Sequence, residues 1–325
     1  MTSPAEPIAI TRGEAYNVHY YIKKDPMKIG AFELIEPLPE LREPHALAML
    51  RPWIDVGSVG TLALSRLESH LQAQELGKLA KPGMFFDFTR YRPTLTSRDG
   101  KREVTVPNSF VRYARRASGP DFVFLHLLEP HMFGEDYTDS VVELFKALGI
   151  KRYFLAGAMY DAVPHTRPLL VTGSISGVSI QHILGASKVE QSTYEGPTTI
   201  NYLVGQKASA LGIENSSLIA HLPQYAQLDE DFSGAARVLE IIAAIYALPK
   251  SIIDYKRGEE QYRELSLAVA SNPRLKPMIK QLEQTYDARA QAQPGPPQTK
   301  LSAELEGFLR EMGEKLDGGG SEPKT

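Results

Sequence analysis

Short apolar runs alternate with amphipathic stretches over much of the chain. In the intervening stretches, apolar residues recur every three or four positions, as on one face of a helix. The run at 122–128 is apolar except for His126, which is typical of a strand covered on both faces. The predicted strands are 46–50, 122–128, 153–156, 169–172 and 217–221, and the predicted helices among them are 59–80, 138–148 and 198–211. The pattern predicts an α/β fold with a mixed, largely parallel sheet and helices on both faces.

Strand patterns end near residue 231, and a C-terminal helical region follows. Helices are expected at 235–248, 259–271 and 274–287, separated by Pro249 and Pro273. The expected organisation is an irregular N-terminal arm at 1–30, an α/β core domain at 31–230, a helical subdomain at 231–290, a Pro-rich linker at 291–300, an amphipathic terminal helix at 301–316 and a disordered tail at 317–325.

Composition and charge exclude several classes of protein. The 36 basic and 39 acidic residues give a net charge of −3, which argues against a nucleic-acid binder. The absence of cysteine removes disulfides, thiol nucleophiles and cysteine-ligated metals. No apolar run approaches the ~20 residues of a membrane span, and the N-terminus has no export-signal pattern. We therefore expect a cytoplasmic protein that does not enter membranes.

Four polar segments are candidates for function: 86–93, 128–131, 161–168 and 194–199. Three follow or border predicted strands, and the carboxyl ends of parallel strands meet at one edge of a sheet, where α/β proteins bind ligands. The candidates for proton transfer are Glu129, Asp161, His165 and Glu195. The candidates for binding a ligand or partner are Asp87, Arg90, Arg92, His131, His165, Arg167, Tyr194 and Thr198.

Each segment also has a structural interpretation. Asp87 could pair with its own neighbouring arginines. In a ligand site Asp161 could fix the tautomer of His165, whereas in the structural interpretation the Asp-His-Arg cluster holds a loop or forms a subunit contact. Gly57 and Gly60 before a helix hint at an anion or cofactor loop, but close helix–strand packing explains them equally well. His126 is expected to be a satisfied core histidine. Known catalytic motifs and metal-ligand spacings are missing, so we expect no metal and no cofactor.

The polar segments together resemble the proteasome assembly chaperone family, in its second-subunit branch with archaeal and bacterial relatives. The motifs that carry the resemblance are Phe86-Asp87-Phe88-Thr89-x-x-Arg92-Pro93, Val163-Pro164-His165-Thr166-Arg167-Pro168 and Tyr194-Glu195-Gly196-Pro197-Thr198. Residues 217–225 are similar to a further family segment, but Ile219 and Gln224 replace its Trp and His. The resemblance covers roughly residues 46–290.

The resemblance implies a fold related to nucleoside phosphorylases and peptidyl-type hydrolases, with an added helical piece, and homo-oligomers such as a homotrimer. Eukaryotic members of the family guide assembly of the proteasome α-ring, and some archaeal relatives bind proteasome particles. The resemblance therefore implies a chaperone-like protein whose partners are other copies of itself and a proteasome-like or unknown protein. The family's glycine-rich first loop is reduced here to residues 55–60.

Two hypotheses follow. The first is a non-enzymatic, protein-binding, chaperone-like scaffold whose C-terminal helices are available to a partner. The second is a phosphorylase- or hydrolase-like enzyme, or a binder of a small anion. In the second, Arg92 and Arg167 would hold an oxyanion while a carboxylate or His165 moves a proton. The two hypotheses differ in whether the polar side chains line one cleft.

Overall fold

The computed structural model describes residues 27–174 and 181–291. Residues 1–26 of the expected N-terminal arm lie outside the described residues, as do the terminal helix at 301–316, the tail at 317–325 and all but the first residue of the linker.

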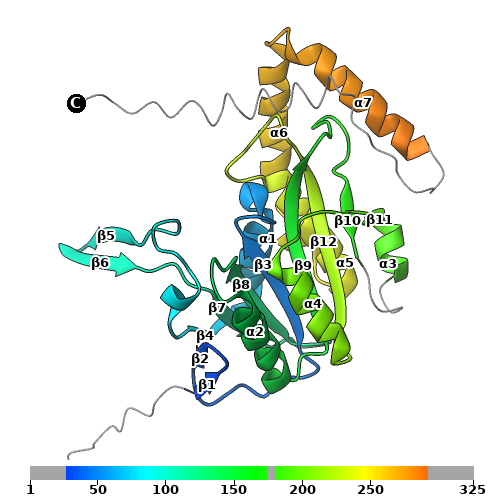
Figure 1. The fold of residues 1–325 in the computed structure, drawn as a ribbon. Helices are drawn as coiled ribbons and strands as arrows, with labels where there is room; N and C mark the ends of the chain where they lie inside the picture. The colour runs from blue at the N-terminus through cyan, green and yellow to red at the C-terminus, as the bar shows by residue number, and fades with distance from the viewer. Residues whose placement is uncertain (1–26, 175–180, 292–325) are drawn as a thin grey trace, which may run out of the picture.

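One ten-stranded mixed sheet forms the centre of the described protein (Figure 1). Its strand order is β1-β2-β4-β7-β8-β3-β9-β12-β10-β11. The middle strands β8, β3, β9 and β12 are parallel, and β7, β4, β2 and β1 continue the sheet antiparallel on one side. On the other side, β10 is antiparallel to β12 and parallel to β11. The strands span Met27–Ile29 (β1), Phe32–Leu34 (β2), His45–Arg51 (β3), Gln74–Leu79 (β4), Phe110–Ala114 (β7), Phe122–Leu128 (β8), Arg152–Asp161 (β9), Val171–Gly173 (β10), Val189–Gln191 (β11) and Glu214–Pro223 (β12).

Helices cover both faces of the sheet, as the alternating pattern predicts. On one face, α1 (Val59–Leu71) and α5 (Phe232–Tyr246) pack on a cluster that includes Leu47, Phe154 and Leu218. On the other face, α2 (Gly134–Leu148) and α4 (Ile200–Ala210) enclose a second cluster. The short α3 (Gln181–Ala186) contacts α5. Short 3₁₀ turns lie at Val56–Ser58 (η1), Pro82–Met84 (η2) and Lys250–Ile252 (η4).

Every strand predicted near the sheet centre is present, but several boundaries differ. The helix expected at 59–80 ends at Leu71, because Gln72 adopts a left-handed conformation with φ of 53°. Residues 74–79 form β4, which pairs antiparallel with β2 and β7. Helix α2 begins one turn before the predicted Thr138, and α4 begins two residues after the predicted Thr198.

A separate antiparallel hairpin of β5 (Thr94–Arg98) and β6 (Lys101–Thr105) projects away from the sheet, as Figure 1 shows. Its turn is Asp99-Gly100, and both residues have positive φ angles, of 50° and 76°. This combination is the one that two-residue hairpin turns require, and Asp-Gly is favoured there. The hairpin was not predicted from the sequence.

His126 is a satisfied core histidine, as predicted. Its Nε2 lies 2.5 Å from the carboxylate of Glu68 on α1, whose side chain is also buried. Arg112 on β7 donates to the second oxygen of Glu68 at 2.8 Å, and the ring of Phe110 stacks on the imidazole. The buried carboxylate of Glu68 on α1 thus contacts both Arg112 on β7 and His126 on β8, which connects α1 to the sheet.

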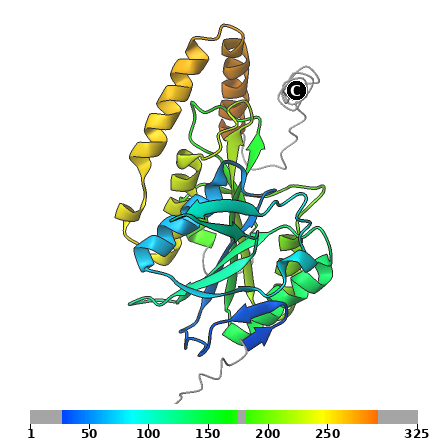
Figure 2. The same cartoon turned by 90° about the vertical axis from the view of Figure 1, so that its left-hand side faces the viewer.

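Helices α6 (Tyr255–Ala270) and α7 (Leu275–Gln291) rise together beyond one end of the sheet (Figures 1 and 2). Only Gly258 and Val269 of α6 are buried among the described residues. A small apolar cluster joins the two helices, and it includes Val269, Met278, Ile279 and Leu282. Ala162 and Tyr225 from the core pack against this cluster, so the α6–α7 hairpin stands on loops at the carboxyl edge of the sheet.

Candidate functional site

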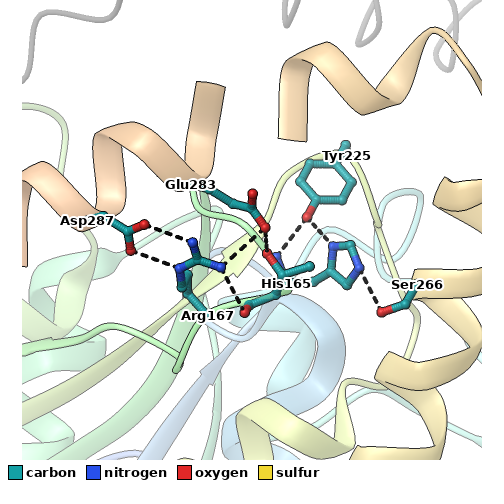
Figure 3. Close-up of polar contacts among 7 residues, drawn as sticks. His165, Arg167, Tyr225, Ser266, Glu283 and Asp287 are labelled. Carbon is teal, nitrogen blue, oxygen red and sulfur yellow. Dashed lines mark hydrogen bonds and ion pairs between the residues drawn. The ribbon is translucent and has the colours of Figure 1, made fainter. Parts of the chain in front are cut away.

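The loop Val163–Pro168 leaves the end of β9 and lies against the α6–α7 hairpin (Figure 3). His165 is buried within this loop, and Tyr225, from the segment after β12, contacts it twice. The Tyr225 hydroxyl accepts from the backbone N–H of His165 at 2.8 Å and lies 2.6 Å from its Nδ1. On the other side of the ring, Nε2 lies 3.1 Å from Oγ of Ser266 on α6. His165 therefore links the core to α6.

The hydrogen-bond partners of His165 accommodate a neutral imidazole. The Ser266 hydroxyl donates to the carbonyl of Tyr262, so toward Nε2 it accepts. The Tyr225 hydroxyl accepts from the backbone N–H and can also donate its own proton to Nδ1. A neutral imidazole with its proton on Nε2 satisfies both contacts of the ring. Burial lowers the pKa of His165, with Glu283 opposing the shift, which agrees with a neutral imidazole.

Arg167 and Thr166 bind α7. The Arg167 guanidinium donates from Nε and Nη2 to the two oxygens of Asp287, each at 2.8 Å, and from Nη1 to Glu283 at 3.2 Å. The Thr166 hydroxyl donates to Glu283 at 2.5 Å, and Tyr286 Oη donates to the Pro168 carbonyl at 2.8 Å. Hydrogen bonding to Arg167 lowers the pKa of the Asp287 carboxyl. The loop is thus a polar anchor for α7.

Asp161 does not orient His165, contrary to the expectation. Its Oδ2 lies 2.7 Å from Nδ1 of His221 on β12, and Nε2 of His221 lies 2.9 Å from the hydroxyl of Thr172 on β10. Neighbouring strands bring these three side chains into line, because His221 stands beside both β9 and β10. Burial alone would raise the pKa of Asp161, but the hydrogen bond and charge of His221 bring it below its ordinary value.

Asp87, Glu129 and His131 belong to a second group, on the side of the sheet that α2 and α4 cover. Glu129 follows β8, and its Oε1 accepts from the backbone N–H of Ile200, the first residue of α4, at 3.0 Å. Burial raises the pKa of Glu129. The backbone N–H of Asp87 donates to Nδ1 of His131 at 3.2 Å, and the ring of Tyr91 contacts the imidazole. The segments at 86–93 and 128–131 therefore meet, and Glu129 also contacts the first residue of α4.

The remaining candidates face solvent. Arg90 and Arg92 are exposed, and Arg90 pairs at 3.9 Å with Asp87, which also accepts hydrogen bonds from Thr89. The local pairing predicted as the alternative for Asp87 is therefore present. The further exposed candidates are Tyr194, Glu195 and Thr198. Tyr194 donates to the Pro197 carbonyl of its own loop at 2.9 Å.

The two groups share one edge of the sheet but do not form a single cluster. Strand β3 lies between β8, which positions Glu129, and β9, which positions Asp161. Two strand spacings amount to about 10 Å. In this arrangement Glu129 bonds to the start of α4 and Asp161 bonds to His221, so the two carboxylates have different partners.

Gly57 and Gly60 serve close packing at the start of α1. A Cβ on Gly60 would stand 2.5 Å from the carbonyl oxygen of Ala156, and Gly57 has φ of 58° beside Asp231. The Asp55 carboxylate accepts from the backbone N–H groups of Gly60 and Thr61, at 2.6 and 3.1 Å. Because a protein carboxylate already occupies this helix terminus, the turn does not have the form of an anion or cofactor loop.

Sequence reasoning missed most of the partners of the anchoring loop. Tyr225, Ser266, Glu283 and Asp287 lie 60 to 120 residues beyond it along the chain. Nothing in a single sequence pairs residues at such separations. His221 was assigned only to a strand, although its position one strand from Asp161 follows once β9 and β12 are placed as parallel neighbours.

Within residues 27–174 and 181–291, no group of three His, Asp or Glu side chains has the geometry to hold a metal ion. None of the helices in these same ranges is long and apolar enough to cross a membrane.

Comparison with known proteins decides the family. The model of the PAC2 family matches residues 49–270. The chain belongs to the PAC2 family. The match spans the anchoring loop, α6 and most of the sheet, and it agrees with the resemblance that the sequence motifs indicate. No curated protein matches the sequence.

Solved structures share the fold of this PAC2 family chain. A Mycobacterium tuberculosis protein of unknown function matches with a TM-score of 0.71 and 24% identity, covering 82% of this chain and 94% of that one. A proteasome-assembly chaperone homologue from the same organism matches with a TM-score of 0.64 and 22% identity, covering 72% and 99%. PbaB, an archaeal proteasome activator from Pyrococcus furiosus, matches with a TM-score of 0.57 and 15% identity, covering 74% and 98%.

Proposed function

We propose that this PAC2 family chain is a non-enzymatic, chaperone-like protein that binds another protein through its α6–α7 hairpin. The single observation that carries the proposal is the anchoring loop Val163–Pro168, whose polar side chains are engaged by the hairpin. The polar side chains of this loop hold α6 and α7 in position, and the two helices can then offer an exposed surface to a partner. In a catalytic motif the reactive atoms would instead face a cleft.

The hairpin offers the surface that such a role needs. Most of α6 is exposed, and Leu267 leaves 63% of its surface in solvent. Polar and charged residues surround it on α6, as at the rim of a protein interface. The names of the structural neighbours, a proteasome-assembly chaperone homologue and a proteasome activator, suggest a proteasome-like particle as the class of partner. We place the chain in the cytoplasm, as a homo-oligomer such as a trimer.

Capture from the native host tests this function. The full chain, immobilised on resin, should retain a protein that also binds again after purification, and Leu267→Glu should weaken that second binding by at least about tenfold. The matched control is Leu211→Glu, which introduces the same charge at an exposed leucine after α4. Failure to recover any partner, or equal binding by Leu267→Glu, would contradict the proposal. Light scattering that gives only the monomer mass would contradict the oligomer.

A second candidate function is hydrolysis at Thr172, favoured by the Asp161–His221–Thr172 chain. A carboxylate, an imidazole and a hydroxyl in this order form the arrangement that activates an oxygen nucleophile. The full chain should then cleave p-nitrophenyl acetate above the rate of free imidazole, and Thr172→Val should abolish the excess. Equal rates for the two proteins would eliminate this candidate.

A further inference from the structure

A groove of about 670 Å³ runs along the outer side of α5. Its floor is built from small side chains of α5, including Ala236, Ala243 and Ala244, of which Ala244 is exposed. Leu169 and Leu248 add apolar surface at its sides. Alanines leave the α5 backbone accessible to large side chains, so this surface is shaped to accept another apolar helix.

The rim of the groove has a small positive excess. Arg167 lines it but is paired with Asp287 and Glu283, which leaves Arg237, Lys188 and Lys250 against the carboxylates of Glu240 and Glu259. Arg237 pairs with Glu240 and also donates to the carbonyl of Ser187, which brings its guanidinium across the groove wall. Lys188 and Lys250 also line the rim. An occupant with an apolar face and an acidic flank would be complementary to this surface.

The last turns of α7 are fixed to the same rim. Tyr286 bonds to the carbonyl of Pro168, a lining residue of the groove, and Arg289 pairs with Glu190, two residues after Lys188. Helix α7 ends at Gln291, two residues after Arg289. The nine residues 292–300 can span up to about 30 Å when extended, so residue 301 can reach the groove without difficulty.

Residues 301–316 combine apolar and acidic side chains, which are complementary to the groove. In 301–316 the large apolar residues recur at helical spacing: Leu301, Leu305, Phe308, Leu309, Met312 and Leu316. The same stretch carries four glutamates against one arginine and one lysine. As a helix it would be about 24 Å long. The part of α5 that lines the groove, from Ser233 to Ala244, extends for about 17 Å.

We propose that the α5 groove binds this chain's own segment Leu301–Leu316 as a helix. Its leucines and Phe308 lie on the alanine floor, and its glutamates face Arg237, Lys188 and Lys250. This goes beyond the proposed function, because it concerns an intramolecular contact on α5 and does not depend on any partner of the α6–α7 hairpin.

Engineered cysteines test the contact in the full chain. The protein has no cysteine, so an introduced pair provides the only thiols. Ala244→Cys with Leu309→Cys should form a disulfide within one chain, at least about tenfold faster than the control pair Leu211→Cys with Leu309→Cys. Leu211 is exposed and follows α4, on the opposite face of the sheet from α5. Equal rates would overturn the proposal, as would disulfides that form only between two chains.

Hydrogen exchange provides a test without cysteines. The amides of 301–316 should exchange at least about tenfold more slowly than those of an unstructured chain. Ala244→Arg should remove this protection, while Ala268→Arg, at an exposed alanine of α6 outside the groove, should leave it unchanged. Exchange of 301–316 at the unstructured rate in the unmodified chain would overturn the proposal. Protection that survives Ala244→Arg would do the same.

Discussion

Arg167 and Asp287 lie 120 residues apart in the sequence and form a bidentate pair, with both hydrogen bonds 2.8 Å long. The planar guanidinium matches the carboxylate, so the pair fixes an orientation as well as a distance. It joins the loop after β9 to the last turns of α7. These polar contacts act beside the small apolar cluster of Val269, Met278, Ile279 and Leu282, on which Ala162 and Tyr225 from the core pack.

Acid should loosen the hairpin through His165. Burial lowers the pKa of this imidazole below its ordinary value of 6.5. His165 therefore binds a proton more weakly in the folded state than after the hairpin opens, so protonation favours the opened state. The contribution of neutral His165 is fully present above pH 6.5 and is lost as the pH falls toward the folded-state pKa. Protection factors of α6 and α7 amides, measured between pH 7.5 and 5.5, should fall by up to about tenfold per pH unit below 6.5.

His165→Gln is the control for that titration, because glutamine does not titrate in this range. Its hairpin should be less protected at pH 7.5 and should show little further loss on acidification. A pH dependence equal to that of the unmodified chain would assign the effect to another group, such as the facing carboxylate of Glu283, and would contradict the role of His165.

Gly60→Ala should destabilise the protein. The added Cβ would stand 2.5 Å from the Ala156 carbonyl oxygen, which belongs to the central strand β9 and cannot move away easily. We expect a loss of about 2 kcal/mol in the free energy of unfolding, measured by urea denaturation. Gly185→Ala is the matched control, since nothing lies within 4 Å of its added Cβ. A stable Gly60→Ala protein would reopen the question of a ligand loop at this turn.

Glu68→Gln should cost more than a surface substitution. The buried carboxylate holds both His126 and Arg112, and its neutral replacement leaves the Arg112 charge without its partner. Glu68 is buried, but the Arg112 side chain is 37% exposed and solvent lowers the cost, so we expect a loss of about 2 kcal/mol of unfolding free energy. Thermal and urea unfolding should report this loss, whereas Glu143→Gln, at an exposed position of α2, should change little. A cost for Glu68→Gln below about 1 kcal/mol would show that the pair is not structurally important.

The sheet centre could be predicted from the sequence because its strands are continuous apolar runs. Residues 122–128 are all buried, as strands covered on both faces are. The edges could not be predicted in the same way. Strand β6 is exposed at every position, so its sequence carries no burial pattern. The Asp99-Gly100 turn was the one local indication of the β5–β6 hairpin.

The candidate site was only partly predictable for a related reason. The sequence places polar residues at strand ends, which is where Glu129, Asp161 and His165 lie. The sequence does not show on which face of the sheet each of these side chains lies or how many strands separate them. The intervening strand β3 divides the expected cluster, and the hairpin that engages His165 and Arg167 comes from a distant part of the chain.

Hydrogen exchange of α7 in Arg167→Ala tests most directly whether the loop anchors the hairpin. Amides of Leu275–Gln291 should lose at least about tenfold in protection, while those of β3 and β9 keep theirs. Arg263→Ala, at an exposed arginine of α6, should leave α7 as protected as in the unmodified chain. Unchanged protection of α7 in Arg167→Ala would contradict the account.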